Sequence, residues 1–137
     1  MSAAPLRFAG YAALFGRQDL GGDTIMPGAF SFAISRLMRG ADKLPLLWQH
    51  RKDRRIGWVE DLAEDDRGLR VIGRIDRVDH PAAHALRRGA VSGISFGYRA
   101  KSYVRQGAGR ELRELDVFEV SLVTQPMQPL ARVHLIN

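Results

Sequence analysis

The sequence has no cysteine among its 137 residues. Disulfide bonds, iron–sulfur clusters and catalysis by a thiol are therefore excluded. The chain also lacks any apolar run near the roughly 20 residues that a membrane-spanning helix requires. Residues 1–16 show no basic segment ahead of an apolar core, so we expect no signal peptide. These absences favour a reducing, cytosolic compartment.

The composition is that of a globular protein with an excess of positive charge. Apolar residues make up 45% of the chain and charged residues 26%, which argues against a disordered tail. The length fits one domain over residues 1–137. The net charge is +6 and would attract polyanions or acidic proteins. Basic residues are scattered except for RKDRR at 51–55, which fits a solvated loop as well as a binding surface.

The spacing of apolar residues predicts a mainly β protein. Alternation with period two is strongest over 91–106, and GAG at 107–109 predicts a turn into an antiparallel return. The expected strands cover 6–16, 43–50, 56–65, 68–76, 91–106, 110–125 and a last short segment after 126. Six or seven strands with two helices favour a small, mostly antiparallel or mixed β-barrel flanked by helices, in the α+β class.

Proline and glycine mark the limits of the two expected helices. The first helix is predicted over 27–40, starting at a proline and stopping at a glycine. Its apolar face should hold Phe30, Ile34, Leu37 and Met38. The second helix is predicted over 79–89, with Asp79 as its N-terminal cap.

The stretch SGISFGY at 92–98 places a serine between two glycines. In a strand, Ile94 and Phe96 point to one side, whereas Ser95 and the flanking Gly93 and Gly97 point to the other. Glycine in a strand often marks the close approach of a ligand or another backbone. Ser95 is therefore either a nucleophile over which a peptide substrate can lie, or a solvent-facing serine at a bulge or bend.

The same residues match G-x-S-x-G, the nucleophile elbow of α/β-hydrolases. That motif needs a strand, a sharp turn and a helix, but strand texture continues after Ser95. The order of a hydrolase triad would also require Asp116 and His134, and the chain is short for that fold. We therefore disfavour this interpretation.

A serine needs a base to become a nucleophile, and the chain has four histidines. His80 and His84 have a metal-ligand spacing, but no cysteine or intervening glutamate supports a metal site, so a structural role is favoured. His134 lies near the chain end. His50 ends the apolar run 43–50, on the same side as Leu46 and Trp48 if the run is a strand, and is either a base at a rim or a structural residue.

Several blocks in a fixed order resemble the caudovirus prohead serine protease family, the maturation proteases of tailed phages and phage-like particles. The blocks are YAALFGRQDLGGDTIMPGAF, LPLLWQH, IGWVEDLAEDDRGLRV, GAVSGISFGY and FEVSLVTQPMQPLA. They extend over about residues 8 to 132. The family is similar in fold and chemistry to the herpesvirus assembly protease, a barrel flanked by helices.

The resemblance implies a catalytic role for three residues. His50, which ends LLWQH, takes the place of the base, and Ser95 takes that of the nucleophile. Glu119, in FEVSLV, matches the third member, while Asp116 and Asp53 stay open as candidates for the same role. In a regular strand Glu119 shares a face with Ser121 but not with Asp116, which favours Glu119.

The resemblance also implies the surroundings of the reaction. The donors to the oxyanion would come from TQPMQPLAR, where Gln125, Met127 and Gln128 keep their N–H groups. The expected substrates are the major capsid protein and scaffold segments inside the procapsid, in the cytoplasm of a bacterial host, with self-cleavage as a further reaction. No metal or organic cofactor is expected, and the choice between monomer and homodimer stays open.

Two other functions compete with a protease. One is a capsid assembly factor that kept the barrel and lost activity. The other is a basic barrel that binds single-stranded nucleic acid by stacking on Phe96, Tyr98 and Tyr103. Phe96 and Tyr98 lie on the apolar side of their strand, so core packing is favoured for them and specific nucleic-acid binding is not expected.

Overall fold

The computed structural model describes residues 4–40 and 43–137. Eight strands and two helices lie within these ranges. The strands are β1 (Leu6–Leu14), β2 (Asp23–Ile25), β3 (Pro45–Trp48), β4 (Arg51–Glu64), β5 (Gly68–Ile75), β6 (Gly93–Gln106), β7 (Gly109–Val123) and β8 (Val133–Ile136). The helices are α1 (Ser31–Met38) and α2 (Pro81–Arg87). Neither helix is long and apolar enough to cross a membrane.

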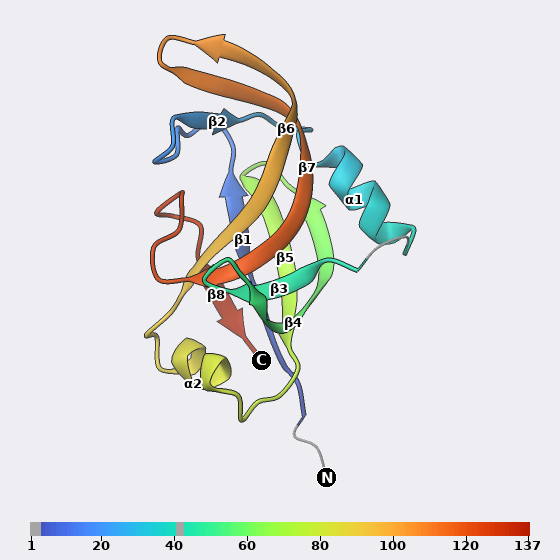
Figure 1. Cartoon of the computed structure of the whole chain (residues 1–137), viewed down its shortest axis with the longest axis vertical. Coiled ribbons are helices and arrows are strands. Elements are labelled where there is room, and N and C mark those ends of the chain that lie inside the picture. The colour runs from blue at the N-terminus through green and yellow to red at the C-terminus, as the bar shows by residue number, and fades with distance from the viewer. Residues whose placement is uncertain (1–3, 41–42) are drawn as a thin grey trace.

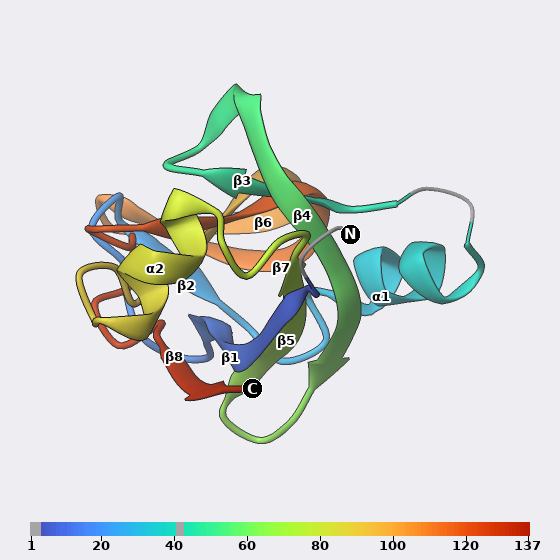
Figure 2. The same ribbon diagram turned by 90° about the horizontal axis from the view of Figure 1, so that it is seen from below.

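All eight strands belong to one strongly curled sheet (Figures 1 and 2). The order of neighbours is β2-β7-β3-β4-β5-β1-β8, and β6 pairs with β7. Most pairs are antiparallel, but β7 runs parallel to β2 and β3. The expected mainly β, barrel-like fold with two helices is therefore correct.

The segment between β7 and β8 joins the two ends of the curl. The N–H of Tyr11 in β1 donates to the carbonyl of Arg132, at 3.2 Å. On the other side, the N–H of Ile94 in β6 donates to the carbonyl of Ala131, at 2.9 Å. Residues 131–133 thus link β1 to β6 across the opening of the sheet.

The curl encloses the hydrophobic core. Its fully buried side chains come from both halves of the chain, including Leu6, Phe30, Leu46, Ile94, Leu115 and Leu122. Helix α1 packs beside β7 and β4, while α2 lies at the lower end of the molecule in Figure 1 and faces the viewer in Figure 2. One face of each strand therefore points inward, and the site described below lies on the outer face of β6 and β7.

The helix predictions are correct in place and wrong in detail. Helix α1 starts at Ser31 because the chain around Pro27 forms turns, and Gly40 with φ +67° follows its end as expected. Met38 is 79% exposed, so it does not belong to the apolar face. The cap of α2 is His80, whose Nδ1 accepts from the Ala82 N–H, because the expected cap Asp79 pairs with Arg77 instead.

One region predicted as irregular is a strand, and one short strand was not predicted. Residues 51–55, a solvated-loop candidate, begin β4, because the chain turns at once after β3 and pairs back on it. The turn-rich region 17–23 leads into the short strand β2, which pairs with β7. The strand count of eight among the described residues therefore exceeds the expected six or seven.

Candidate active site

Ser95 lies in the middle of the long hairpin formed by β6 and β7. Its Cα is paired with that of Ser121, and Gly97 is paired with Glu119. Residues directly opposite each other on an antiparallel pair share a face, so Ser95, Ser121 and Glu119 share one. The apolar partners Ile94 and Leu122 point to the core on the opposite face.

The glycines on either side of Ser95 make room for the protein itself. A Cβ on Gly97 would lie 2.7 Å from Glu119 Oε1, and a Cβ on Gly93 would lie 2.7 Å from Pro126 Cδ. The clearance expected for a peptide substrate is therefore occupied by a carboxylate on one side and a loop on the other. Ser95 is only 3% exposed, so the interpretation as a solvent-facing serine is wrong.

His50 reaches the same face from a tight turn between β3 and β4. Gln49 and His50 both have positive φ, 52° and 61°, as in the two-residue turns that connect antiparallel strands. The turn takes His50 off the face of Leu46 and Trp48, where a continuous strand would have placed it. Positive φ in residues other than glycine costs free energy and clusters at functional sites.

The imidazole of His50 is bonded to Glu119. Its Nδ1 lies 2.5 Å from Glu119 Oε1, and the side chains are 42% and 12% exposed respectively. This hydrogen bond raises the pKa of His50 above its usual value, and partial burial opposes the rise to a smaller extent. With Nδ1 held by the carboxylate, Nε2 is the nitrogen left to exchange a proton with another group.

Ser121 joins the parts of this arrangement. Its hydroxyl donates to Glu119 Oε2 at 2.6 Å and accepts from the His50 backbone N–H at 3.1 Å. Ser121 is fully buried and directly opposite Ser95. Sequence reasoning gave it no role, although its position two residues after Glu119 on the same face was a signal.

A β-bulge next to the site changes the expected faces of β7. Gly97 pairs with Glu119 and the next residue, Tyr98, pairs with Val117, so Phe118 is an extra residue in β7. Asp116 therefore lies on the same side as Glu119, contrary to the regular-strand argument. Asp116 instead pairs with Arg36 at 3.4 Å and Arg99 at 3.8 Å, whereas Glu119 contacts His50.

Asp53, like Asp116, pairs with arginine rather than with His50. It forms an ion pair with Arg51 at 3.7 Å and is 73% exposed. Asp116 and His134, the partners required by the hydrolase-elbow interpretation, are not joined to Ser95, and the ring of His134 lies against Tyr11. Ser95 also sits inside a strand rather than at a strand-to-helix turn, so that interpretation is wrong.

The segment expected to supply oxyanion donors runs beside Ser95. Pro126 closes over Gly93, two residues before Ser95 on the same face. Gln128 is buried and its side-chain amide is bonded to Leu14, which fixes the segment to β1. Within the described chain, the backbone N–H groups of Gln125, Met127 and Gln128 donate no hydrogen bond to another residue.

The aromatic residues considered for nucleic-acid stacking do not form a platform. Phe96 is 9% exposed and packs on Phe30 and Tyr98 in the core. Tyr98 is half-buried and donates its hydroxyl to Asp23. Tyr103 is the exposed member, and the Arg110 guanidinium lies over its ring.

Two phage proteins are similar to this chain in sequence. The chain is 32% identical to the prohead protease of Enterobacteria phage HK97 over 133 residues. This match covers 92% of the chain but 58% of the relative, so the chain spans little more than half of that protein. It is also 31% identical to the capsid polyprotein of Pseudomonas phage PAJU2 over 101 residues, which is 66% of the chain and 15% of the polyprotein.

The fold has a solved counterpart. The varicella-zoster virus protease superposes with a TM-score of 0.58 and 22% identity, over 95% of this chain and 63% of that one. At this identity the likeness shows the fold alone. The family model described as caudovirus prohead serine protease matches residues 2–137. The chain therefore belongs to the caudovirus prohead serine protease family.

Proposed function

We propose that the protein is a serine endopeptidase in which Ser95 is the nucleophile, His50 the general base and Glu119 the residue that orients the base. One observation carries the proposal: His50 bonds to Glu119 and to Ser121, and Ser121 lies directly opposite Ser95 on the β6–β7 hairpin. Family membership adds support, since the family is defined by serine proteolysis.

The first half-reaction forms an acyl-enzyme. His50 Nε2 takes the proton from the Ser95 hydroxyl, whose oxygen attacks the carbonyl carbon of the scissile peptide. Glu119 accepts the Nδ1–H hydrogen bond, fixes the tautomer and stabilises the imidazolium. The protonated His50 then gives its proton to the leaving amine as the C–N bond breaks.

The second half-reaction releases the new carboxylate. Water loses a proton to His50 Nε2 and attacks the acyl carbon, and the Ser95 oxygen leaves with the proton returned. Each tetrahedral intermediate needs N–H donors for its oxyanion. We assign this role to the segment after β7, because its Pro126 packs over Gly93, two residues from Ser95. The N–H groups of Gln125, Met127 and Gln128 in this segment have no acceptor among the described residues.

The substrates that fit the family are capsid and scaffold segments inside a procapsid. One relative is a phage prohead protease and another is a capsid polyprotein, which supports a protease that works on the shell in which it is enclosed. Self-cleavage is a second reaction in this proposal. The site needs no metal or organic cofactor for this chemistry.

A fluorophosphonate probe and a co-expressed major capsid protein test the proposal together. The wild-type protein should be labelled at Ser95, and mass spectrometry should find cleaved capsid protein. Ser95→Ala should keep the fold but lose the label and about 10⁶-fold in kcat, as triad serines do. His50→Ala should also lose cleavage.

Two results would contradict the proposal. The first is full cleavage by a folded Ser95→Ala protein. The second is an intact wild-type protein that neither reacts with the probe nor cleaves, which would favour a capsid assembly factor without activity. Light scattering on the same samples reports whether the active species is a monomer or a homodimer.

A further inference from the structure

A groove outside the proposed catalytic residues lies between β4 and α2. It has a volume of about 400 Å³. Its apolar floor is formed by side chains from the strands and the helix, namely Trp48, Ile56, Pro81 and Ala85. Its charged lining residues are the three arginines Arg54, Arg55 and Arg88 and one carboxylate, Asp53. The groove therefore combines an apolar surface with an edge on which arginines outnumber the single carboxylate.

Arg54 and Arg88 differ from the other arginines nearby in their ion pairing. Other arginines nearby are paired, Arg55 with Asp76 at 3.1 Å and Arg51 with Asp53 at 3.7 Å. Arg54 and Arg88 form no ion pair with any residue that the structure describes, and both are exposed. An exposed guanidinium is a ready donor for a planar carboxylate.

His80 adds a fixed donor to the same groove. Its Nδ1 accepts from the Ala82 N–H at 3.0 Å as the cap of α2. A ring nitrogen that accepts carries no proton, so the neutral ring has its proton on Nε2. This Nε2–H is not used by the cap and can donate to an acceptor in the groove.

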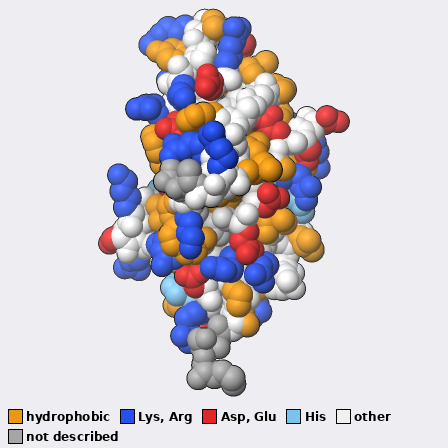
Figure 3. All heavy atoms as spheres, turned by 90° about the vertical axis from the view of Figure 1, so that its right-hand side faces the viewer, with side chains coloured by type: hydrophobic (Ala, Val, Ile, Leu, Met, Phe, Trp, Pro, Cys, Tyr) orange, Lys and Arg blue, Asp and Glu red, His pale blue; other side chains and the backbone are white. Residues whose placement is uncertain are grey.

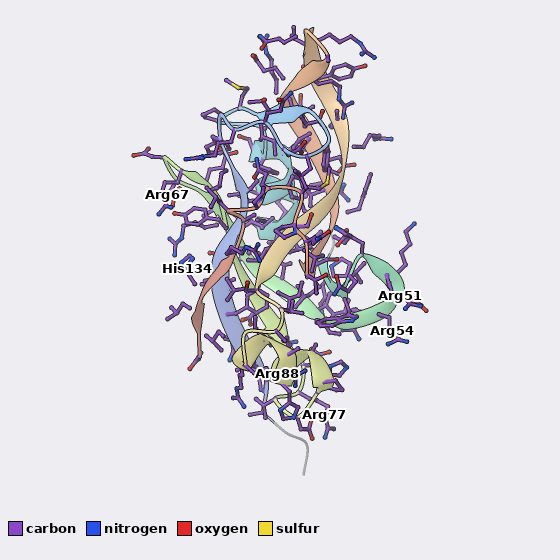
Figure 4. The ribbon with its side chains drawn as sticks, turned by 90° about the vertical axis from the view of Figure 1, so that its left-hand side faces the viewer. Arg51, Arg54, Arg67, Arg77, Arg88 and His134 are labelled. Carbon is purple, nitrogen blue, oxygen red and sulfur yellow. The ribbon has the colours of Figure 1, made fainter. Side chains whose placement is uncertain are left out.

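The groove is adjacent to the proposed active site. Trp48 lies two residues before His50, and the hairpin that carries His50 also carries Arg51 and Arg54. Figure 4 shows these two arginines on the hairpin and Arg88 beside α2, at the same end of the molecule, with Arg67 and His134 on the other side. A peptide bound in the groove would therefore lie next to the β3–β4 hairpin, which carries His50.

We propose that this groove binds an acidic segment of the protein substrate, with an aliphatic or aromatic side chain on the Trp48 floor and carboxylates at Arg54 and Arg88. The inference rests on the proposed function, because it assigns the groove to the substrate of the neighbouring site. Charge complementarity selects the acidic segment, and the apolar floor selects protein over nucleic acid, for which the groove offers no exposed stacking ring beyond one half-buried indole.

Binding is tested with cleavage switched off. A Ser95→Ala protein is titrated into a short fluorescein-labelled peptide of alternating glutamate and leucine, and anisotropy gives the Kd. The same peptide with lysine in place of glutamate serves as the charge control. We expect saturable binding of the acidic peptide only, with a shift of the Trp48 indole N–H signal in NMR spectra, assigned by Trp48→Phe.

Two double variants that lower the net charge equally distinguish binding in the groove from general electrostatic attraction of the peptide to a basic protein. Arg54→Ala with Arg88→Ala should raise the Kd at least about fivefold, the sum of two exposed ion pairs. Arg39→Ala with Arg105→Ala removes two exposed arginines that lie after α1 and near the tip of the β6–β7 hairpin. This control should change the Kd less than about twofold.

Several outcomes would overturn the groove assignment: no saturable binding, equal weakening by both double variants, an unmoved Trp48 signal, or tighter binding of a single-stranded DNA oligonucleotide. Cleavage of capsid protein by the wild type is measured separately. Cleavage without peptide binding overturns the groove assignment and leaves the proposed function standing. Peptide binding at Trp48 without any cleavage overturns the proposed function, and with it the assignment of the bound segment to a substrate.

Discussion

Glu119 is held at His50 because each of its two carboxylate oxygens has its own donor. Oε1 faces the imidazole and Oε2 accepts from the Ser121 hydroxyl. Gly97 opposite leaves the space that the carboxylate occupies. The carboxylate is thus fixed in one orientation before any substrate arrives, as the orienting role in a triad requires.

Exchanging each acid for its amide distinguishes Glu119 from Asp116. Glu119→Gln keeps the shape but loses the charge that fixes the His50 tautomer, so kcat should fall by about 10⁴-fold, as amide replacement does in other triads. Asp116→Asn removes a carboxylate that pairs with Arg36 and Arg99, and should lower kcat only slightly. Steady-state kinetics on a capsid-derived peptide measures both. A crippled Asp116→Asn beside an active Glu119→Gln would contradict the assignment.

The pH dependence should follow His50. Its hydrogen bond to Glu119 raises the pKa of His50, and a general base acts in its neutral form. We therefore expect kcat/KM to rise with pH, with the midpoint of the rise above the usual histidine pKa of about 6.5. In Glu119→Gln the midpoint should move to lower pH. The His50–Glu119 bond contributes to stability with the opposite pH dependence. Because the pKa of His50 is raised in the folded protein, this contribution is fully present below the pKa of His50 in the unfolded chain. It is lost as the pH rises through the pKa of the folded state. An NMR titration of His50 with the same midpoint in both proteins would contradict this.

For single residues, the sequence identified the candidate site residues more accurately than it predicted which face of a strand they occupy. The blocks around His50, Ser95 and Glu119 were enough to select all three as candidates, and the structure brings His50 and Glu119 into contact. The prediction that Asp116 and Glu119 lie on opposite faces of their strand was wrong, because the bulge at Phe118 inserts one residue into β7. A period-two pattern in the sequence does not reveal such an insertion. The choice of Glu119 depends on contacts, not on alternation.

The turn between β3 and β4 is the element that delivers His50. Besides the His50–Glu119 bond, the Gln49 N–H donates to the Leu122 carbonyl of β7 at 3.0 Å, and the His50 N–H donates to Ser121. The N–H of Thr124, just after β7, donates to the Gln49 side chain at 3.1 Å. These bonds offset the cost of two positive φ angles. The turn therefore moves with β7, which also carries Glu119.

Ser121→Ala should loosen this coupling between the turn and β7. The change leaves the His50 N–H and Glu119 Oε2 without their partner, which should lower stability by about 1–3 kcal/mol. A misplaced base should lower kcat by roughly 10²-fold, and the pKa of His50 should fall toward its ordinary value. Urea unfolding, kinetics and NMR measure the three effects.

Ser31→Ala, which removes an exposed hydroxyl bonded to the Gly28 carbonyl, is the control. It should change the free energy of unfolding by no more than a few tenths of a kcal/mol and should leave kcat and the pKa of His50 unchanged. A Ser121→Ala protein that matches this control would show that the hydroxyl has no positioning role.

The elements themselves were predictable where one local pattern dominates. The hairpin of β4 and β5 and the long pair of β6 and β7 follow from alternation and from turn residues, EDDRG in the first and GAG in the second. Tertiary pairing decided the rest: Arg51–Arg55 became strand because the tight turn folds it onto β3, although its composition is that of a loop. The three-residue strand β2 exists through its pairing with β7, where Asp23 also binds Arg110 at 2.9 Å.

At the scale of the molecule, the positive charge is not spread as one field. On the face shown in Figure 3, acidic and basic side chains are interspersed among small apolar areas. Many arginines are paired, as in Arg7 with Glu60 at 2.7 Å and Arg77 with Asp79 at 2.8 Å. The excess of +6 therefore acts through unpaired side chains such as those at the α2 groove, which the sequence alone did not place.

The closure of the sheet by residues 131–133 connects the integrity of the whole molecule to the site, because Ile94, which precedes Ser95, donates to Ala131. Two truncations test this. Deleting 134–137 removes most of β8, an exposed edge strand that pairs with β1, and should cost about 1 kcal/mol. Deleting 131–137 also removes the bonds to Tyr11, Ile94 and Ser92, and should lower the free energy of unfolding by about 3 kcal/mol more. This longer deletion should also abolish the reaction of Ser95 with a fluorophosphonate. Urea unfolding followed by tryptophan fluorescence gives the midpoints. Equal midpoints and equal labelling for the two truncations would show that the sheet does not depend on this closure.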